Sequence, residues 1–240
     1  MASSADLEGR TALVTGASGG IGAAVSRRLA DAGARVWMVA RNADRLETAA
    51  RDCGGVPVPA DLAHADGART LQAAWARENG AAAPHILVNA AGTFELAAIA
   101  DTEPEMFERM LDGNLRAPFH AIRAFLPGML EAGDGLILTI GSVAGRHAFP
   151  HNGAYSASKF GARGLHAVLD QELRGSGVRA TLLEPAATDT DIWDGIDRDT
   201  NPGLPPRDAM LAADAVADAV HYIATRPAKT RIPVFAIERS

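Results

Sequence analysis

Seven short apolar stretches alternate with longer helix-forming stretches along the chain. The expected strands occupy residues 11–15, 35–40, 56–59, 86–89, 136–140, 179–183 and 232–237, and helical patterns fill the gaps between them. Such alternation is typical of βαβ units, whose strands are parallel because a helix crosses over between them. The sequence therefore predicts an α/β protein with a doubly wound, seven-stranded parallel sheet and helices on both faces.

The length and composition indicate one globular domain. The chain has 240 residues, of which 48% are hydrophobic and 22% charged, values typical of a soluble protein with a full core. The sequence contains no linker, repeat or low-complexity stretch, so residues 1–240 are expected to form a single domain. Residues 186–207 are rich in Asp, Pro and Gly and are expected to form a loop or a lid.

Charge and cysteine usage exclude several classes of protein. A net charge of −6 argues against nucleic acid or an anionic membrane as a partner. The sequence shows neither a signal peptide nor an apolar stretch long enough to span a membrane, so a cytoplasmic location is expected. Cys53 is the only cysteine and the seven histidines have no metal-ligand spacing, so we expect no disulfide and no metal site.

A glycine-rich loop follows the first expected strand and opens the first expected helix. Residues 15–22 read Thr-Gly-Ala-Ser-Gly-Gly-Ile-Gly. Glycines there let the backbone approach a pyrophosphate, and the helix N-terminus offers free N–H groups and the positive end of its dipole. A tight turn without a ligand is the alternative, but the strand–loop–helix context favours dinucleotide binding. The predicted contacts are Gly16, Ser18, Gly20, Ile21 and Gly22.

The end of the second expected strand indicates which dinucleotide is bound. NAD binders usually place an acid there for the ribose 2′-OH, yet no acid occurs between Asp31 and Asp44. Arg41 stands there instead, and a guanidinium can hold a 2′-phosphate with two hydrogen bonds. NADP(H) is therefore favoured over NAD(H), with Arg45 as a possible assistant. A solvated arginine at a helix start is the alternative.

Tyr155 and Lys159 bring two scarce residue types four positions apart. The chain contains two tyrosines and two lysines, and its other basic positions are arginine. On a helix, positions i and i+4 share one face. An ammonium close to a phenol is expected to lower the phenol pKa toward the range useful for acid/base catalysis. An amphipathic helix with a packed Tyr and a solvated Lys remains the alternative.

Ser142 is expected just beyond the carboxyl end of a buried strand. The apolar run over residues 136–140 precedes Gly141-Ser142-Val143-Ala144-Gly145, and open α/β sheets bind ligands at the carboxyl ends of their strands. The Ser142 hydroxyl could hydrogen-bond an oxygen that Tyr155 protonates or deprotonates. An ordinary turn serine is the alternative.

Asn114 lies one helical turn before a proline. The capping-box pattern at residues 102–105 predicts a long helix that runs toward Leu130. Pro118 within it has no N–H, so the carbonyl of Asn114 loses its helical partner and could hold a water. A proline kink that only shapes packing is equally compatible with the residues.

Taken in order, these motifs resemble those of the short-chain dehydrogenase/reductase family over nearly the whole chain. The matching segments are Thr15-Gly16-x-x-x-Gly20-x-Gly22, Asn89-Ala90-Ala91-Gly92, Asn114, Ser142 and Tyr155-x-x-x-Lys159. The resemblance implies a Rossmann fold in which Ser142, Tyr155 and Lys159 are catalytic and Asn114 holds a proton-relay water. It also implies hydride transfer between nicotinamide C4 and a substrate carbon held over Ser142 and Tyr155.

The resemblance implies further cofactor contacts. Asp61 is expected to contact the adenine, Asn89 to lie beside the cofactor, Lys159 to bond the nicotinamide ribose and Thr190 to bind the carboxamide. The predicted set is completed by Leu62, Ala90, Gly92, Pro185 and Thr188.

The chain departs from the family pattern in two places. Ala186 stands where the family often has glycine, and residues 231–238 lack the Asp-Gly-Gly ending of many members. Tetramer contacts through that ending are therefore not expected. The family expectation is a homodimer or homotetramer packed through the helices at 105–130 and 155–173.

Three functions are compatible with these features. The first is an NADP(H)-dependent carbonyl reductase or alcohol dehydrogenase for a small molecule, with Tyr155 as general acid/base. The second is a nucleotide-sugar epimerase or dehydratase, because Gly16-x-x-Gly19-x-x-Gly22 also fits that spacing, although about 55 residues after Pro185 are few for a sugar-binding domain. The third is an NADP(H)-binding sensor without turnover, against which the intact Ser/Tyr/Lys set argues.

The expected lid is acidic and carries apolar residues. We hypothesise that it disfavours anionic substrates and acidic carriers and covers a neutral carbonyl compound, with a merely solvated loop as the alternative. Its carboxylates are Asp189, Asp191, Asp194, Asp197 and Asp199, and its apolar residues are Ile192, Trp193 and Ile196.

Overall fold

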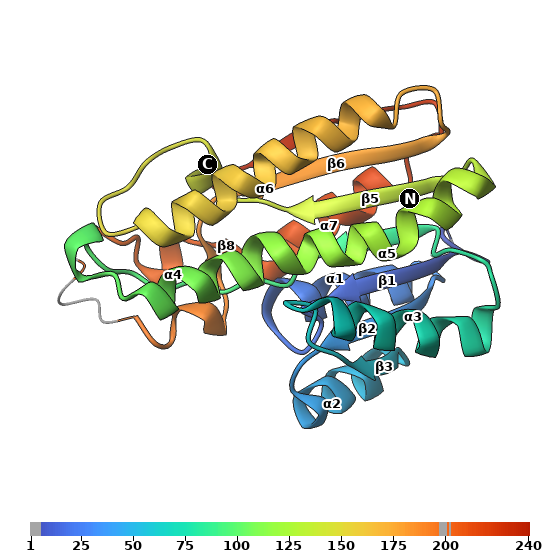
Figure 1. Cartoon of the computed structure of the whole chain (residues 1–240), viewed down its shortest axis with the longest axis horizontal. Helices are drawn as coiled ribbons and strands as arrows, with labels where there is room; N and C mark the ends of the chain where they lie inside the picture. Colours follow the sequence, from blue (N-terminus) through green and yellow to red (C-terminus); the bar gives the residue numbers. More distant parts are fainter. Residues whose placement is uncertain (1–5, 197–200, 202) are drawn as a thin grey trace.

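A seven-stranded parallel sheet forms the centre of the molecule (Figure 1). The computed structural model describes residues 6–196, 201 and 203–240. The strands are β1 (Thr11–Thr15), β2 (Arg35–Ala40), β3 (Val56–Pro59), β4 (Ile86–Asn89), β5 (Gly135–Ile140), β6 (Val178–Pro185) and β9 (Val234–Ile237). Their order is β3-β2-β1-β4-β5-β6-β9. The loop after β1 leads to one face of the sheet, and the loop after the neighbouring strand β4 leads to the other face. The two loops therefore diverge and open a crevice.

Helices cover both faces of the sheet, as the alternating pattern predicts. One core contains side chains of α1 (Gly20–Asp31), α2 (Ala43–Cys53) and α7 (Ala213–Ala224). The other contains side chains of α3 (Ala65–Asn79), α5 (Ala117–Ala132) and α6 (Gly153–Glu172). Along β1, Ala12 and Val14 belong to the first core and Leu13 to the second, because successive side chains of a strand point to opposite faces.

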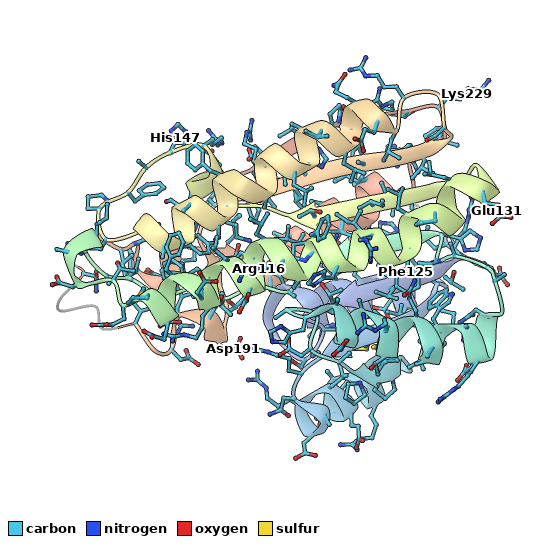
Figure 2. All side chains as sticks on the ribbon, in the orientation of Figure 1. Arg116, Phe125, Glu131, His147, Asp191 and Lys229 are labelled. Atoms are coloured by element: carbon cyan, nitrogen blue, oxygen red, sulfur yellow. The ribbon has the colours of Figure 1, made fainter. Side chains whose placement is uncertain are left out.

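Three aromatic rings hold α3 and α5 against the sheet. The Trp75 ring centroid lies 4.9 Å from that of Trp37 and 5.7 Å from that of Phe125. Figure 2 labels Phe125 on α5. Both tryptophans are almost completely buried. Aromatic side chains bury large apolar areas, so this cluster stabilises the half of the sheet that carries the first glycine loop.

The strand expectations are confirmed with small shifts at the ends. The first four strands have the predicted bounds, β5 begins one residue earlier, and β6 extends over Val178–Pro185. The last strand begins at Val234 rather than residue 232. Pro233 has no N–H to extend the ladder, although its carbonyl accepts a hydrogen bond from Leu182.

The prediction of one long helix from residue 102 toward Leu130 is wrong in two respects. It is divided into α4 (Pro104–Leu111), a π-helical turn at Asp112–Arg116, and α5. Pro118 explains the division, because it cannot supply the N–H of a regular helical bond and the backbone widens before it. The capping box does not form, since the Thr102 hydroxyl donates to the Ala98 carbonyl instead.

The segment after β6 is more regular than the expected loop. A short strand β7 (Thr188–Asp189) pairs with β8 (Leu211–Ala212), and 3-10 turns form at Asp191–Trp193 and Arg207–Ala209. The described helices include none with the length and apolarity needed to cross a membrane.

Candidate active site

The predicted site residues meet in one cavity at the carboxyl ends of β1, β4, β5 and β6. Its volume is about 1110 Å³, above the range of about 300–1,000 Å³ usual for small-ligand pockets, which leaves room for a dinucleotide and a substrate. Every predicted residue except Asn89 lines it. The lining residues from that set are Gly16, Ser18, Gly20, Ile21, Gly22, Arg41, Asp61, Leu62, Ala90, Gly92, Asn114, Ser142, Tyr155, Lys159, Pro185, Thr188 and Thr190.

Gly16 shows why the first loop needs glycine. Its φ is +67°, and a Cβ there would lie 2.6 Å from the Cα of Ala91 and 2.7 Å from the carbonyl oxygen of Ala90. Any side chain would therefore strain the backbone and push apart the loops that follow β1 and β4. A Cβ on Gly22 would lie 2.2 Å from the Gly16 carbonyl oxygen, so this glycine lets α1 begin against the loop.

The N-terminus of α1 suits an anionic ligand. It has neither a side-chain cap nor an acidic residue in its first turn, so the N–H groups and the positive end of the dipole are available to a ligand in the cavity. The Asp191 carboxylate lies beside Gly19 and is paired with Arg45. Behind the cavity wall, Asn89 is 2% exposed and its amide donates to the Thr139 hydroxyl at 3.4 Å. Its buried Oδ1 has no partner among the described residues. These features fit a pyrophosphate-containing dinucleotide.

The two arginines near the end of β2 behave differently. Arg41 is exposed, lines the cavity and makes no hydrogen bond or ion pair within the described residues. Arg45 instead forms an ion pair with Asp191 across the glycine loop. Asp191 is labelled in Figure 2. Arg41 is thus free to bind a ligand phosphate, whereas the assistance expected of Arg45 would require breaking its pair.

Asp61 follows β3 and lines the cavity. Its side chain is exposed, and Oδ1 accepts a hydrogen bond from the N–H of Ala63 at 3.0 Å. That turn fixes the carboxylate and leaves Oδ2 available to a ligand. The neighbouring Leu62 is buried, and its carbonyl oxygen lies 2.8 Å from His120 Nδ1 of α5.

Tyr155 and Lys159 lie on α6 one turn apart, as their spacing predicts. Lys159 Nζ is 5.6 Å from the centroid of the Tyr155 ring and donates a hydrogen bond of 3.1 Å to the Ile140 carbonyl. Lys159 is 6% exposed. Both side chains line the cavity, so the alternative of a solvated lysine is contradicted.

The pKa values correct one expectation. Burial raises the pKa of Tyr155 above its usual value, and a side-chain hydrogen bond with Ser142 lowers it in part. Burial also lowers the pKa of Lys159 to about 8. Removal of water therefore determines the direction of the Tyr155 pKa shift, and the predicted lowering by the ammonium is not observed. The phenol is protonated at neutral pH.

Ser142 occupies the turn between β5 and α6. It caps a 3-10 turn at Val143–Gly145, where its hydroxyl accepts from the N–H of Ala144 at 3.1 Å. The side chain is half-buried and shares the cavity with Tyr155. One hydroxyl group thus serves both the turn and the site.

Asn114 clamps the loop that follows β4. Its Nδ2 donates to the Thr93 carbonyl at 2.9 Å, and its Oδ1 accepts from the Thr93 N–H at 3.2 Å. A Cβ on Gly92 would lie 2.9 Å from that Oδ1. The side chain is 2% exposed and belongs to the π-helical turn, a feature often found at functional sites.

Phe94, which the sequence reasoning missed, contacts both Tyr155 and the lid residue Trp193. The Phe94 ring centroid lies 4.8 Å from those of both Tyr155 and Trp193. Trp193 Nε1 donates to the Thr188 carbonyl at 2.9 Å. The position of Phe94 two residues after the 89–92 motif was the available signal. These rings form an apolar part of the cavity lining beside Tyr155.

The acidic lid residues are neutralised by arginines. Arg207 pairs with Asp189 and Asp194, and Arg45 pairs with Asp191. On the facing wall, Glu95 and Arg109 form a two-bond ion pair at 2.9 and 2.8 Å. The lid is therefore less negative than the sequence suggests; Asp197 and Asp199 lie outside the described residues.

Comparison with known proteins identifies the class. The short chain dehydrogenase family model matches residues 10–201. The chain belongs to the short-chain dehydrogenase/reductase family of oxidoreductases, as the sequence motifs predict.

Individual relatives extend this comparison. The chain is 36% identical over 228 residues to D-threitol dehydrogenase of Mycolicibacterium smegmatis, covering 91% of this chain and 87% of that protein. It is 35% identical over 241 residues to glycine betaine reductase ATRR of Emericella nidulans, covering 97% of this chain but 19% of that protein's length. A metagenomic short-chain oxidoreductase crystallised with NADP superposes with a TM-score of 0.82 at 32% identity, covering 98% of this chain and 99% of that one.

Proposed function

We propose that this chain is an NADP(H)-dependent oxidoreductase that interconverts a small carbonyl compound and a secondary alcohol. The observation that carries the proposal is the meeting of Ser142, Tyr155 and Lys159 in one cavity with the glycine loop. NADP(H), when bound, supplies or accepts the hydride. The residues after β6 complete the same sheet through α7 and β9, which supports this function over the epimerase alternative.

Tyr155 is the proposed proton donor and acceptor. Its raised pKa keeps the phenol protonated at neutral pH, which is the form that donates to the oxygen of a carbonyl under reduction. Ser142 orients that oxygen by a hydrogen bond. The same raised pKa means that alcohol oxidation, which needs the phenolate, gains rate as the pH rises.

Arg41 is the proposed ligand of the 2′-phosphate. We expect Arg41→Ala to raise KM for NADPH about tenfold to a hundredfold, because a charge-assisted bidentate contact contributes about 1.5–3 kcal/mol. KM for NADH should change by less than about twofold, since NADH has no 2′-phosphate. Steady-state kinetics with both cofactors measures this. Arg51→Ala, an exposed change on α2, the helix that follows Arg41, and outside the cavity, is the matched control, and an equal loss for both cofactors would contradict the assignment.

The segment at about 186–207 is the proposed substrate lid. Within its described part, Trp193 contacts the Phe94 ring opposite, and Asp191 is tied to Arg45 beside the glycine loop. The lid thus touches both the substrate side and the cofactor side of the cavity. Its apolar residues would cover the reacting carbon and keep water away from it.

A neutral substrate fits this pocket better than an anion. The arginines on the substrate side are paired, Arg109 with Glu95 and Arg207 with Asp189, so a carboxylate would find no free cation among them. We expect kcat/KM for a neutral ketone to exceed that for the matched keto acid by roughly tenfold or more, since burying an unpaired charge is costly. A clear preference for the acid would end this assignment.

An apolar helical face supports the expected oligomer. Large apolar side chains are exposed on α4, α5 and α6, and such patches mark interfaces. We expect light scattering to give a mass at least twice that of the 240-residue chain, and Phe160→Glu to lower it. A monomer at micromolar concentration would refute this. The exposed residues are Phe107, Phe119, Leu130, Phe160 and Val168.

A further inference from the structure

Glu184 is a buried carboxylate that the proposed chemistry does not use. It lies near the end of β6, directly before the cavity-lining Pro185, and is 1% exposed. Burying a carboxylate is costly unless it is paired and hydrogen-bonded. The ion-pair partners of the Glu184 carboxylate therefore indicate its structural role.

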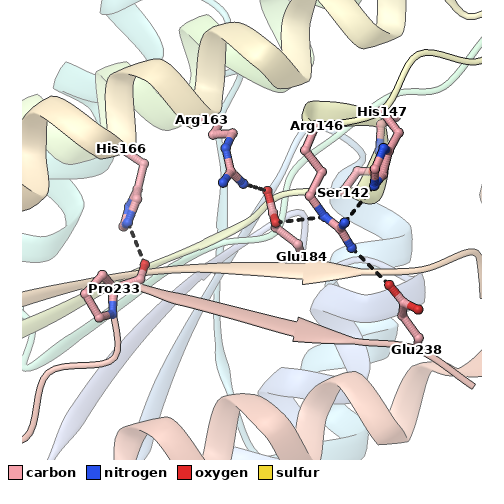
Figure 3. A network of polar contacts seen from close by, with 9 residues as sticks. Ser142, Arg146, His147, Arg163, His166, Glu184, Pro233 and Glu238 are labelled. Atoms are coloured by element: carbon pink, nitrogen blue, oxygen red, sulfur yellow. Dashed lines mark hydrogen bonds and ion pairs between the residues drawn. The ribbon is translucent and has the colours of Figure 1, made fainter.

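Two arginines from different elements hold this carboxylate (Figure 3). Arg163 of α6 pairs with its Oε1, and Arg146 Nε lies 3.4 Å from its Oε2. Arg163 comes one helical turn after Lys159. Arg146 ends the 3-10 turn that Ser142 begins. The one carboxylate thus joins the helix of Tyr155 and Lys159 to the turn of Ser142.

Two glycines bring the Ser142 turn into contact with both neighbours. A Cβ on Gly145 would lie 3.0 Å from the Lys159 carbonyl oxygen, and one on Gly141 would lie 3.3 Å from Glu184 Cγ. The turn is therefore wedged between β6 and α6 with little space to move. A change in the Glu184 pairs should be transmitted to Ser142 and Lys159 through this contact.

An outer carboxylate completes the charge balance. Arg146 donates to Glu238 at 2.9 Å and lies 2.7 Å from His147 Nε2. The two carboxylates and two guanidiniums sum to zero. Further along α6, His166 faces the Pro233 carbonyl and Asp170 pairs with Arg231. Without Glu184, Glu238 would still balance Arg146, so one uncompensated guanidinium charge would be added to the cation of Lys159.

We propose that Glu184 is a positioning residue: its carboxylate, held between Arg146 and Arg163, fixes the Ser142 turn against the helix that carries Tyr155 and Lys159. This inference rests on the proposed function. It assigns Glu184 no contact with substrate or cofactor and predicts an effect on the reaction rather than on cofactor affinity.

Glu184→Gln keeps the size and loses the charge. We expect kcat to fall roughly tenfold to a hundredfold, since small misplacements of reacting groups are costly. KM for NADPH should stay within about twofold, because the residues that bind the phosphates are untouched. The rise in the rate of alcohol oxidation at alkaline pH should shift to lower pH by about half a unit or more, because the one excess positive charge favours the phenolate.

Two further variants keep the test decisive. Glu238→Gln, at a side chain that is 61% exposed, should change kcat by less than about twofold. Arg163→Gln leaves excess negative charge and should move the alkaline rise to higher pH, opposite to Glu184→Gln, and it carries the test if Glu184→Gln fails to fold. Parent-like kcat and pH profile in a folded Glu184→Gln, or shifts of the same sign in both variants, would overturn the proposal. A parent without turnover would instead refute the proposed function.

Discussion

Replacing Tyr155 by phenylalanine is expected to lower kcat about 10³-fold while NADPH still binds. The change removes one hydroxyl from the ring that Phe94 contacts at 4.8 Å and keeps the ring. General acid/base groups contribute about 10²–10⁴-fold to rate. Turnover measured by NADPH absorbance, together with a calorimetric titration of NADPH, separates the two effects.

The chain provides a matched control for this change. Tyr222 on α7 is the other tyrosine and is 46% exposed, so Tyr222→Phe should leave kcat within about twofold of the parent, as is usual for surface substitutions. If Tyr155→Phe retained more than about a tenth of the parent kcat, another group would have to transfer the proton.

Lys159→Met is expected to abolish turnover and to stabilise the unliganded protein. Burial lowers the pKa of Lys159 from 10.5 to about 8, and each pH unit of lowering costs about 1.4 kcal/mol of stability while the lysine is charged. The hydrogen bond to Ile140 offsets part of this cost. We expect the free energy of unfolding at pH 7 to rise by about 2 kcal/mol in the variant, as measured by urea denaturation.

The pH dependence of this effect has a definite sign. The folded chain releases the Lys159 proton near pH 8 and the unfolded chain near pH 10.5. The unfolded state therefore binds more protons between these two pH values. Lys159 should thus increase the free energy of unfolding of the parent as the pH rises from about 8 to about 10.5. The gain should vanish in Lys159→Met and persist in Lys229→Met, which alters the exposed second lysine. A Lys159→Met variant less stable than the parent at pH 7 would contradict this account.

Local patterns predicted most of the fold. The β-strand positions follow from apolar runs whose lengths match strands, and the parallel sheet follows from the helices between them. The sequence predicted the break before α5 only in part. Pro118 removes a helical hydrogen bond, but this loss is compatible with either a kink or a wider helical turn. The structure shows a π-helical turn at Asn114.

Pairings between distant residues could not be predicted from one sequence. Glu184 with Arg163, and Arg45 with Asp191, join positions that only the folded sheet brings together. The pKa of Tyr155 was misjudged for a related reason. The spacing of Tyr155 and Lys159 shows that they share a face, but the amount of water removed from both depends on the surrounding loops.

The central claim is that Tyr155, Lys159 and Ser142 form a working site for NADP(H)-dependent carbonyl reduction. The most direct measurement is the absorbance of NADPH and NADH during incubation of the purified protein with a panel of neutral ketones, aldehydes and secondary alcohols. We predict steady NADPH consumption with at least one neutral ketone, an equal amount of alcohol formed, and slower consumption of NADH. Bound NADPH with no oxidation by any member of the panel would contradict the account.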